Sequence, residues 1–200
     1  MNLPIYNVVI DDYETGIDRI SLVQSPAVEC NFLAFAKDKK QMLFNTNEEQ
    51  QMITGVLMRA DYPIYRNDAQ LGEYYIQFSK ETIKTMAEKL LLDCHQNWIN
   101  IEHTENSDIQ GVDMVELYIK DSSKGINPVG FDEISDGSLF ATFKVRNPLV
   151  WECIKNGTFL GFSIEGMFSY EQVVNVDDEQ AIYDEILSML DKISEMKGGN

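Results

Sequence analysis

The chain reads Phe159-Leu160-Gly161-Phe162-Ser163-Ile164-Glu165-Gly166-Met167-Phe168 over its most informative stretch. The run is mostly apolar and strand-like, and it places one serine between two glycines. A glycine allows another backbone or a ligand to approach closely. We therefore expect a strand that presents the Ser163 hydroxyl, together with nearby backbone N–H groups, to a reacting carbonyl.

A serine nucleophile needs a base, and the chain has 2 histidines, His95 and His103. His103 follows a second apolar run, so Ser163 and His103 together suggest a serine hydrolase. The alternative from these residues alone is a buried strand serine and a loop histidine. We interpret His95 as structural, because a histidine just after a helix interacts with the last carbonyls and the helix dipole.

Composition limits the function classes. A chain of 200 residues fits one domain with a sizeable core, and a net charge of −17 opposes binding to nucleic-acid phosphates. The 3 cysteines are widely spaced and form no CxxC motif, which indicates a reducing compartment without disulfides or zinc. We expect no metal and no cofactor, since the sequence has neither a His/Cys cluster nor a phosphate-binding glycine loop. It also shows no signal peptide and no membrane-spanning run, so we expect a soluble protein of cytosolic type.

Hydrophobic periodicity predicts strands at 5–10, 19–23, 32–35, 52–58, 74–78, 98–102, 112–119 and 139–145, besides the one that carries Ser163. It predicts helices at 79–91 after the N-cap Ser79, at 149–155 after Asn147-Pro148, and at 179–196. We interpret 62–66, which contains Pro63, as a loop. Many strands and few helices predict an α+β fold around a mainly antiparallel core. Residues 1–177 would form the domain, and residues 178–200 an amphipathic helix and tail.

Four parts of the chain resemble a known family. They are 55–66 with 72–79, the pair Glu102-His103, the strand 114–119, and Gly161 to Gly166. In these motifs and their order the chain resembles the tailed-phage prohead maturation proteases, in particular the XkdF-like branch, which are similar to the herpesvirus assemblin proteases. The resemblance implies a β-barrel core of the herpesvirus-protease type with a few surrounding helices.

The resemblance also implies site residues: Ser163 as nucleophile and His103 as base. The family's third element lies in a strand after the nucleophile, but its nearest match here is 20–27, near the N-terminus. This indicates a rearranged N-terminal strand, with Ser21 as the third catalytic member and Asp18 as the alternative. Arg19 and Ser21 share one face of such a strand and Asp18 points to the other. A further alternative is that no acidic third member exists.

The implied function is a serine endopeptidase that processes capsid or scaffold protein, or both, during phage prohead maturation, and that cleaves itself. Its partners would be the phage major capsid protein and the scaffold protein, inside the immature capsid in the host cytoplasm. The sequence Ile193-Ser194-Glu195 is a candidate site for self-cleavage, and the C-terminal helix is a candidate contact in a homo-oligomer. The alternative is a catalytically inactive structural protein with the same fold, associated with capsid or scaffold. An esterase is disfavoured because the G-x-S-x-G motif is incomplete.

Overall fold

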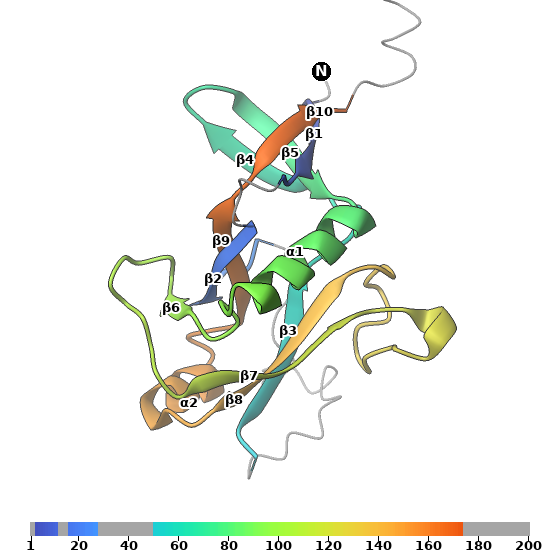
Figure 1. The fold of residues 1–200 in the computed structure, drawn as a ribbon. Coiled ribbons are helices and arrows are strands. Elements are labelled where there is room, and N and C mark those ends of the chain that lie inside the picture. Colours follow the sequence, from blue (N-terminus) through green and yellow to red (C-terminus); the bar gives the residue numbers. More distant parts are fainter. Residues whose placement is uncertain (1–2, 12–15, 28–49, 174–200) are drawn as a thin grey trace, which may run out of the picture.

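The structure of the chain is a computed structural model that describes residues 3–11, 16–27 and 50–173. Two α-helices occur in this part of the chain, α1 (Lys80–Leu92) and α2 (Pro148–Lys155), with one short 3₁₀ turn, η1 (Ser122–Lys124). The strands, shown in Figure 1, are β1 (Ile5–Val9), β2 (Gly16–Val23), β3 (Met52–Met58), β4 (Ile64–Asp68), β5 (Gly72–Phe78), β6 (Ile99–Ile101), β7 (Val112–Ile119), β8 (Leu139–Val145), β9 (Gly161–Met167) and β10 (Ser169–Gln172).

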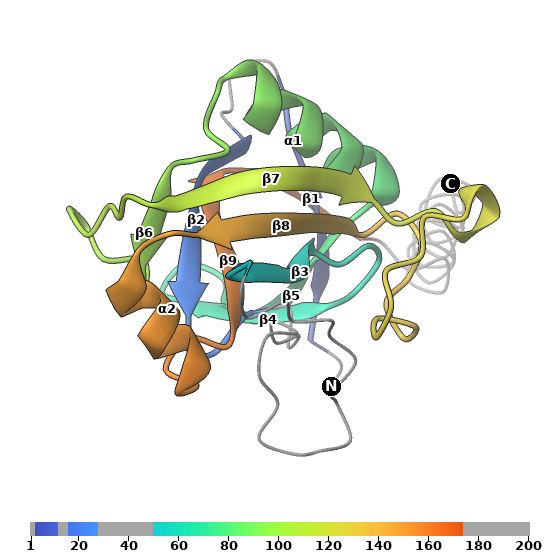
Figure 2. The same ribbon diagram turned by 90° about the horizontal axis from the view of Figure 1, so that it is seen from below.

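The strands form three sheets, with the orders β10-β1-β5-β4, β6-β2-β9 and β3-β8-β7. Most neighbouring strands are antiparallel, but β1 pairs with β5, and β2 with β6, in parallel. Figure 2 shows β2 and β9 running crosswise to β7 and β8, so the sheets are layered as in a sandwich.

The predicted β-barrel is therefore wrong for the described residues. A barrel requires one sheet whose first and last strands are hydrogen-bonded to each other. Here each sheet is open and ends in two edge strands, so no ladder runs around the molecule. Side-chain packing joins the sheets instead. The rings of Phe143 on β8 and Phe162 on β9, for example, lie 4.9 Å apart between centroids.

Helix α1 covers the core beside these sheets and contacts β2 and β8. Its buried residues, Ile83, Met86, Ala87 and Leu90, recur at helical spacing and form one apolar face. Each such side chain contributes roughly 1–3 kcal/mol when it is removed from water. The helix begins as predicted, because the Ser79 hydroxyl accepts a hydrogen bond from Thr82 N at 3.0 Å.

The second predicted helix start is also confirmed. Asn147 Oδ1 accepts hydrogen bonds from Leu149 N at 3.1 Å and Val150 N at 3.3 Å, and Pro148 occupies the first turn. The strand predicted at 32–35, the helix predicted at 179–196 and the domain boundary near 177 lie outside the described residues. None of the described helices has the length and apolar character needed to cross a membrane.

Candidate functional site

The sheet β6-β2-β9 brings together three distant parts of the chain. On the central strand, Ser21 lies opposite Asn100 of β6 on one side and opposite Ser163 of β9 on the other. Directly opposite residues in a sheet project from the same face. Figure 1 shows β2 between β6 and β9, so the strand near the N-terminus lies beside the strand that carries Ser163 and beside the strand that precedes His103.

Close packing of β2 against β9 depends on a glycine. A Cβ atom on Gly166 would lie 1.6 Å from the carbonyl oxygen of Gly16, a distance that no real side chain tolerates. This is the close backbone approach expected of a glycine within a strand. The register also shifts between Ile17 and Arg19, which leaves Asp18 as an extra residue on β2.

A tight turn after β6 positions His103. Glu102 and His103 have φ angles of 51° and 54°, and Thr104 N donates to Ile101 O at 2.9 Å across them. Two successive non-glycine residues in this region are unfavourable by about 1–2 kcal/mol each. Strained backbone of this kind persists only where its surroundings hold it, and it clusters at functional sites.

Two side chains, those of Ser107 and Glu102, hold the turn. Ser107 Oγ lies 3.2 Å from both the backbone N–H and the backbone carbonyl of Ile101, and 2.6 Å from Thr104 O. Glu102 Oε1 accepts a hydrogen bond from Gln24 N at 2.7 Å, which ties the turn to the end of β2. The imidazole of His103 is therefore presented from a fixed backbone.

Four side chains meet beneath this turn, and we call them the Glu165 cluster: Ser21, Asn100, His103 and Glu165. Glu165 Oε1 accepts hydrogen bonds from Ser21 Oγ at 2.7 Å and from Asn100 Nδ2 at 2.6 Å. His103 Nδ1 lies 3.1 Å from the same oxygen and 3.0 Å from Ser21 Oγ. Ser21 Oγ also contacts Asn100 Oδ1.

The cluster is buried at its base and open at its top. Ser21 is 0% exposed and Asn100 2%, whereas the side chains of Glu165 and His103 are 30% and 42% exposed. Burial raises the pKa of Glu165, but the hydrogen bonds from Ser21, Asn100 and His103 outweigh it, and the pKa lies below its ordinary value of 4.5. The carboxylate is therefore ionised at neutral pH.

Ser163 lies next to this cluster and lines a pocket of about 290 Å³. Leu57, Ile64 and Phe78 form part of its mainly apolar wall, and Arg66 and Glu165 line it as well. Among the described side chains, none makes a hydrogen bond to Ser163 Oγ or to His103 Nε2. The serine that contacts His103 is thus Ser21. Ser163 lies opposite Ser21 on the neighbouring strand and lines the pocket.

The other sequence candidates face elsewhere. Asp18 lies 4.0 Å from His95 Nδ1, and the His95 ring stacks on Trp98 at 4.1 Å between centroids. Arg19 pairs with Asp108. The structure therefore brings together Ser163, Ser21 and His103, and it places Asp18 beside the other histidine.

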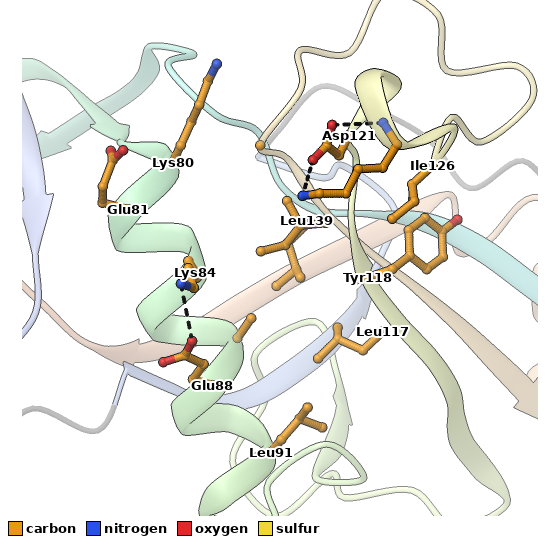
Figure 3. Close-up of a pocket in the computed structure, with 14 residues that line it drawn as sticks. Lys80, Glu81, Lys84, Glu88, Leu91, Leu117, Tyr118, Asp121, Ile126 and Leu139 are labelled. Atoms are coloured by element: carbon orange, nitrogen blue, oxygen red, sulfur yellow. Dashed lines mark hydrogen bonds and ion pairs between the residues drawn. The ribbon is translucent and has the colours of Figure 1, made fainter.

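A larger pocket of about 720 Å³ lies between α1 and β7, as Figure 3 shows. Two ion pairs lie along its lining, with Lys84 Nζ 3.9 Å from Glu88 and Lys124 Nζ 2.5 Å from Asp121. It includes neither of the motif residues Ser163 and His103. Within residues 3–11, 16–27 and 50–173, no three His, Cys, Asp or Glu side chains are arranged to hold a metal ion.

Sequence reasoning missed Glu165 and Asn100 as members of the site. Glu165 was not singled out, although residues two apart on a strand share a face and Glu165 is two positions after Ser163. This two-residue spacing was the signal in the sequence that could have identified Glu165 as part of the site. Asn100 gave no comparable signal, because its role depends on the parallel pairing of β6 with β2.

Comparison with known proteins bears on this geometry. The family model described as "Putative phage serine protease XkdF" matches residues 39–171, which is more than half of the chain and includes Ser163, His103 and Glu165. No curated protein and no solved structure matches the chain. On the strength of the family match, the chain belongs to the XkdF family of phage serine proteases.

Proposed function

We propose that this protein is a serine endopeptidase in which Ser163 is the nucleophile and His103 the general acid and base. One observation carries the proposal. His103 is held through Nδ1 in the Glu165 cluster, which leaves Nε2 without a described partner on a side chain that is 42% exposed. A base held through one ring nitrogen and open at the other is the arrangement that nucleophilic catalysis needs.

The proposed reaction proceeds by acyl transfer. Ser163 Oγ attacks the peptide carbonyl while its proton moves to His103 Nε2, and the C–N bond then breaks as that proton passes to the leaving amine. Water, deprotonated by His103, releases the acyl group and restores the serine. Ser163 Oγ and His103 Nε2 would approach hydrogen-bonding distance when substrate binds, since catalytic contacts are often longer before then.

Ser163 is a better nucleophile than Ser21 for two reasons. Ser21 is 0% exposed and its hydroxyl contacts Glu165 and Asn100, so an incoming carbonyl has no access to it. Ser163 lines an open pocket with a largely apolar wall. That wall favours a substrate with an apolar side chain next to the bond that is cleaved.

The substrates that we propose are the phage major capsid protein, the scaffold protein, or both, cleaved inside the immature capsid in the host cytoplasm. The protease would also cleave its own chain, with Ile193-Ser194-Glu195 as the proposed site. Membership of a phage serine protease family supports this role.

The test uses a fluorophosphonate, which reacts with activated serines: the serine oxygen bonds to phosphorus, fluoride leaves, and His103 accepts the proton. Mass mapping should place the label on Ser163. Ser163→Ala should abolish labelling, and His103→Ala should slow it by about a hundredfold or more. Thermal melts of each variant should remain close to that of the wild type.

Cleavage is measured on gels after co-expression with the capsid or scaffold gene. Wild type should cleave the co-expressed protein, and Ser163→Ala should not. Labelling at Ser21 would overturn the choice of nucleophile. An unlabelled wild-type protein that cleaves neither partner would favour the inactive structural alternative.

A further inference from the structure

We propose that Glu165 is the positioning residue of His103, and that Ser21 and Asn100 hold the Glu165 carboxylate rather than take part in catalysis themselves. The inference deepens the proposed function and rests on the roles of Ser163 and His103 given there. It replaces Ser21 and Asp18 as candidates for the third member.

The first argument is the choice of hydrogen-bonding partners at His103 Nδ1. An ionised carboxylate only accepts hydrogen bonds, and Glu165 Oε1 lies 3.1 Å from Nδ1. Ser21 Oγ, at 3.0 Å, has one proton, and it is directed to Glu165 or to Asn100 Oδ1. Both neighbours of Nδ1 therefore act as acceptors, so the ring proton is on Nδ1 and the lone pair on Nε2.

The second argument is the way Glu165 is fixed. Oε1 receives hydrogen bonds from Asn100 Nδ2 at 2.6 Å and from Ser21 Oγ at 2.7 Å, and both donors are at least 98% buried, given exposures of 2% and 0%. Buried donors from the neighbouring strands define where the carboxylate lies. A carboxylate held in this way sets both the tautomer and the orientation of an imidazole.

The third argument is electrostatic. When His103 takes the proton of Ser163 it becomes an imidazolium, and Glu165 Oε1 then lies 3.1 Å from its Nδ1. The lowered pKa of Glu165 keeps the carboxylate charged at neutral pH, so it stabilises that cation. Asp18 cannot serve here, because its carboxylate is beside His95.

The first experiment observes the ring directly. Nitrogen-15 NMR distinguishes a protonated from an unprotonated ring nitrogen. With 2 histidines in the chain, His95→Gln assigns the spectrum. At a pH where the ring is neutral, wild type should show Nδ1 protonated and Nε2 unprotonated. An Nε2-protonated wild-type ring would overturn the inference, and this measurement needs neither activity nor a Glu165 variant.

The second experiment measures fluorophosphonate labelling of Ser163. Glu165→Gln should lower the maximal labelling rate by about a hundredfold or more, with the half-saturating probe concentration within about twofold of the wild-type value. Asp18→Asn is the matched control and should label at the wild-type rate. A folded Glu165→Gln protein that labels as fast as wild type would overturn the inference while leaving Ser163 and His103 in place. Absence of labelling in wild type would instead contradict the proposed function, and the NMR result would still decide the role of Glu165.

Discussion

The Glu165 cluster, which is buried only at its base, and the buried site of Lys120 differ in how completely their polar groups are hydrogen-bonded. Lys120 is 4% exposed, and its Nζ donates to the carbonyls of Phe131 at 3.0 Å, Ile134 at 2.7 Å and Asp132 at 3.5 Å. Every proton of that group has an acceptor. In the Glu165 cluster the Nδ1 side of His103 is bonded, whereas Nε2 is open among the described residues.

The difference separates a structural group from a reactive one. Lys120 ties the end of β7 to the loop that leads to β8, where Gly137 N also donates to Lys120 O at 2.8 Å. A fully bonded polar group fixes backbone and has no capacity left for a ligand. His103 is held on one side and available on the other, which is what a proton-transferring group requires.

The largest change in stability should follow loss of the Lys120 ammonium. Lys120→Met keeps the aliphatic stem but leaves buried carbonyls without a donor, so we expect the free energy of unfolding to fall by about 3 kcal/mol. The folded fraction should label at Ser163 at the wild-type rate. Urea denaturation measures the first quantity, and fluorophosphonate labelling of the folded protein measures the second.

The matched control is Lys124→Met, which removes an exposed lysine whose partner among the described residues is Asp121. It should change the free energy of unfolding by less than about 1 kcal/mol. If both variants unfolded at the same urea concentration as wild type, the hydrogen bonds of Lys120 would not stabilise the fold.

A pair of buried serines provides a smaller and sharper test. Ser21→Ala removes one of the donors to Glu165 and a contact of His103 Nδ1. We expect a loss of about 1 kcal/mol in unfolding free energy and a labelling rate reduced about tenfold, less than for Glu165→Gln.

Ser138→Ala is the control for that variant, since Ser138 is 0% exposed and its Oγ accepts a hydrogen bond from Ala60 N at 3.0 Å. It should lose similar stability with no change in labelling rate. Equal rate losses in both variants would mean that Ser21 acts through general stability and not through the Glu165 cluster.

The smallest expected effect is in the pH dependence of stability. The pKa of Glu165 is lowered on folding, so its ionised form contributes stability that is complete above the unfolded value and is lost as the pH falls through the folded one. From about pH 6 to about pH 3, wild type should therefore lose more unfolding free energy than Glu165→Gln. Parallel losses in urea titrations of the two proteins would contradict the hydrogen-bond pattern of the cluster.

Local chemistry in the sequence determined the regular elements. Strands β3, β7 and β8 have the predicted bounds because their apolar patterns are long and clear. Helices α1 and α2 begin where Ser79 and Asn147 cap them. Strand β4 was missed, since Pro63 predicts a loop and Ile64–Asp68 becomes a strand only by pairing with β5.

The sequence also singled out Ser163 and His103, because a serine between glycines and a histidine after a strand are local patterns, and the order of the motifs pointed to the family. It did not determine whether the strands form one closed barrel or several open sheets. A barrel and a layered set of open sheets use the same alternating strands, and they differ in which edges find hydrogen-bonding partners.

The partners of His103 were likewise decided by tertiary structure. The extra residue in β2 at Asp18 places that carboxylate beside His95, and the pairing of Ser21 with both Asn100 and Ser163 gathers the residues around Glu165. Asn100 is 79 residues from Ser21 and 65 from Glu165 along the chain. Contacts over such separations arise from strand register, which neighbouring residues alone do not specify.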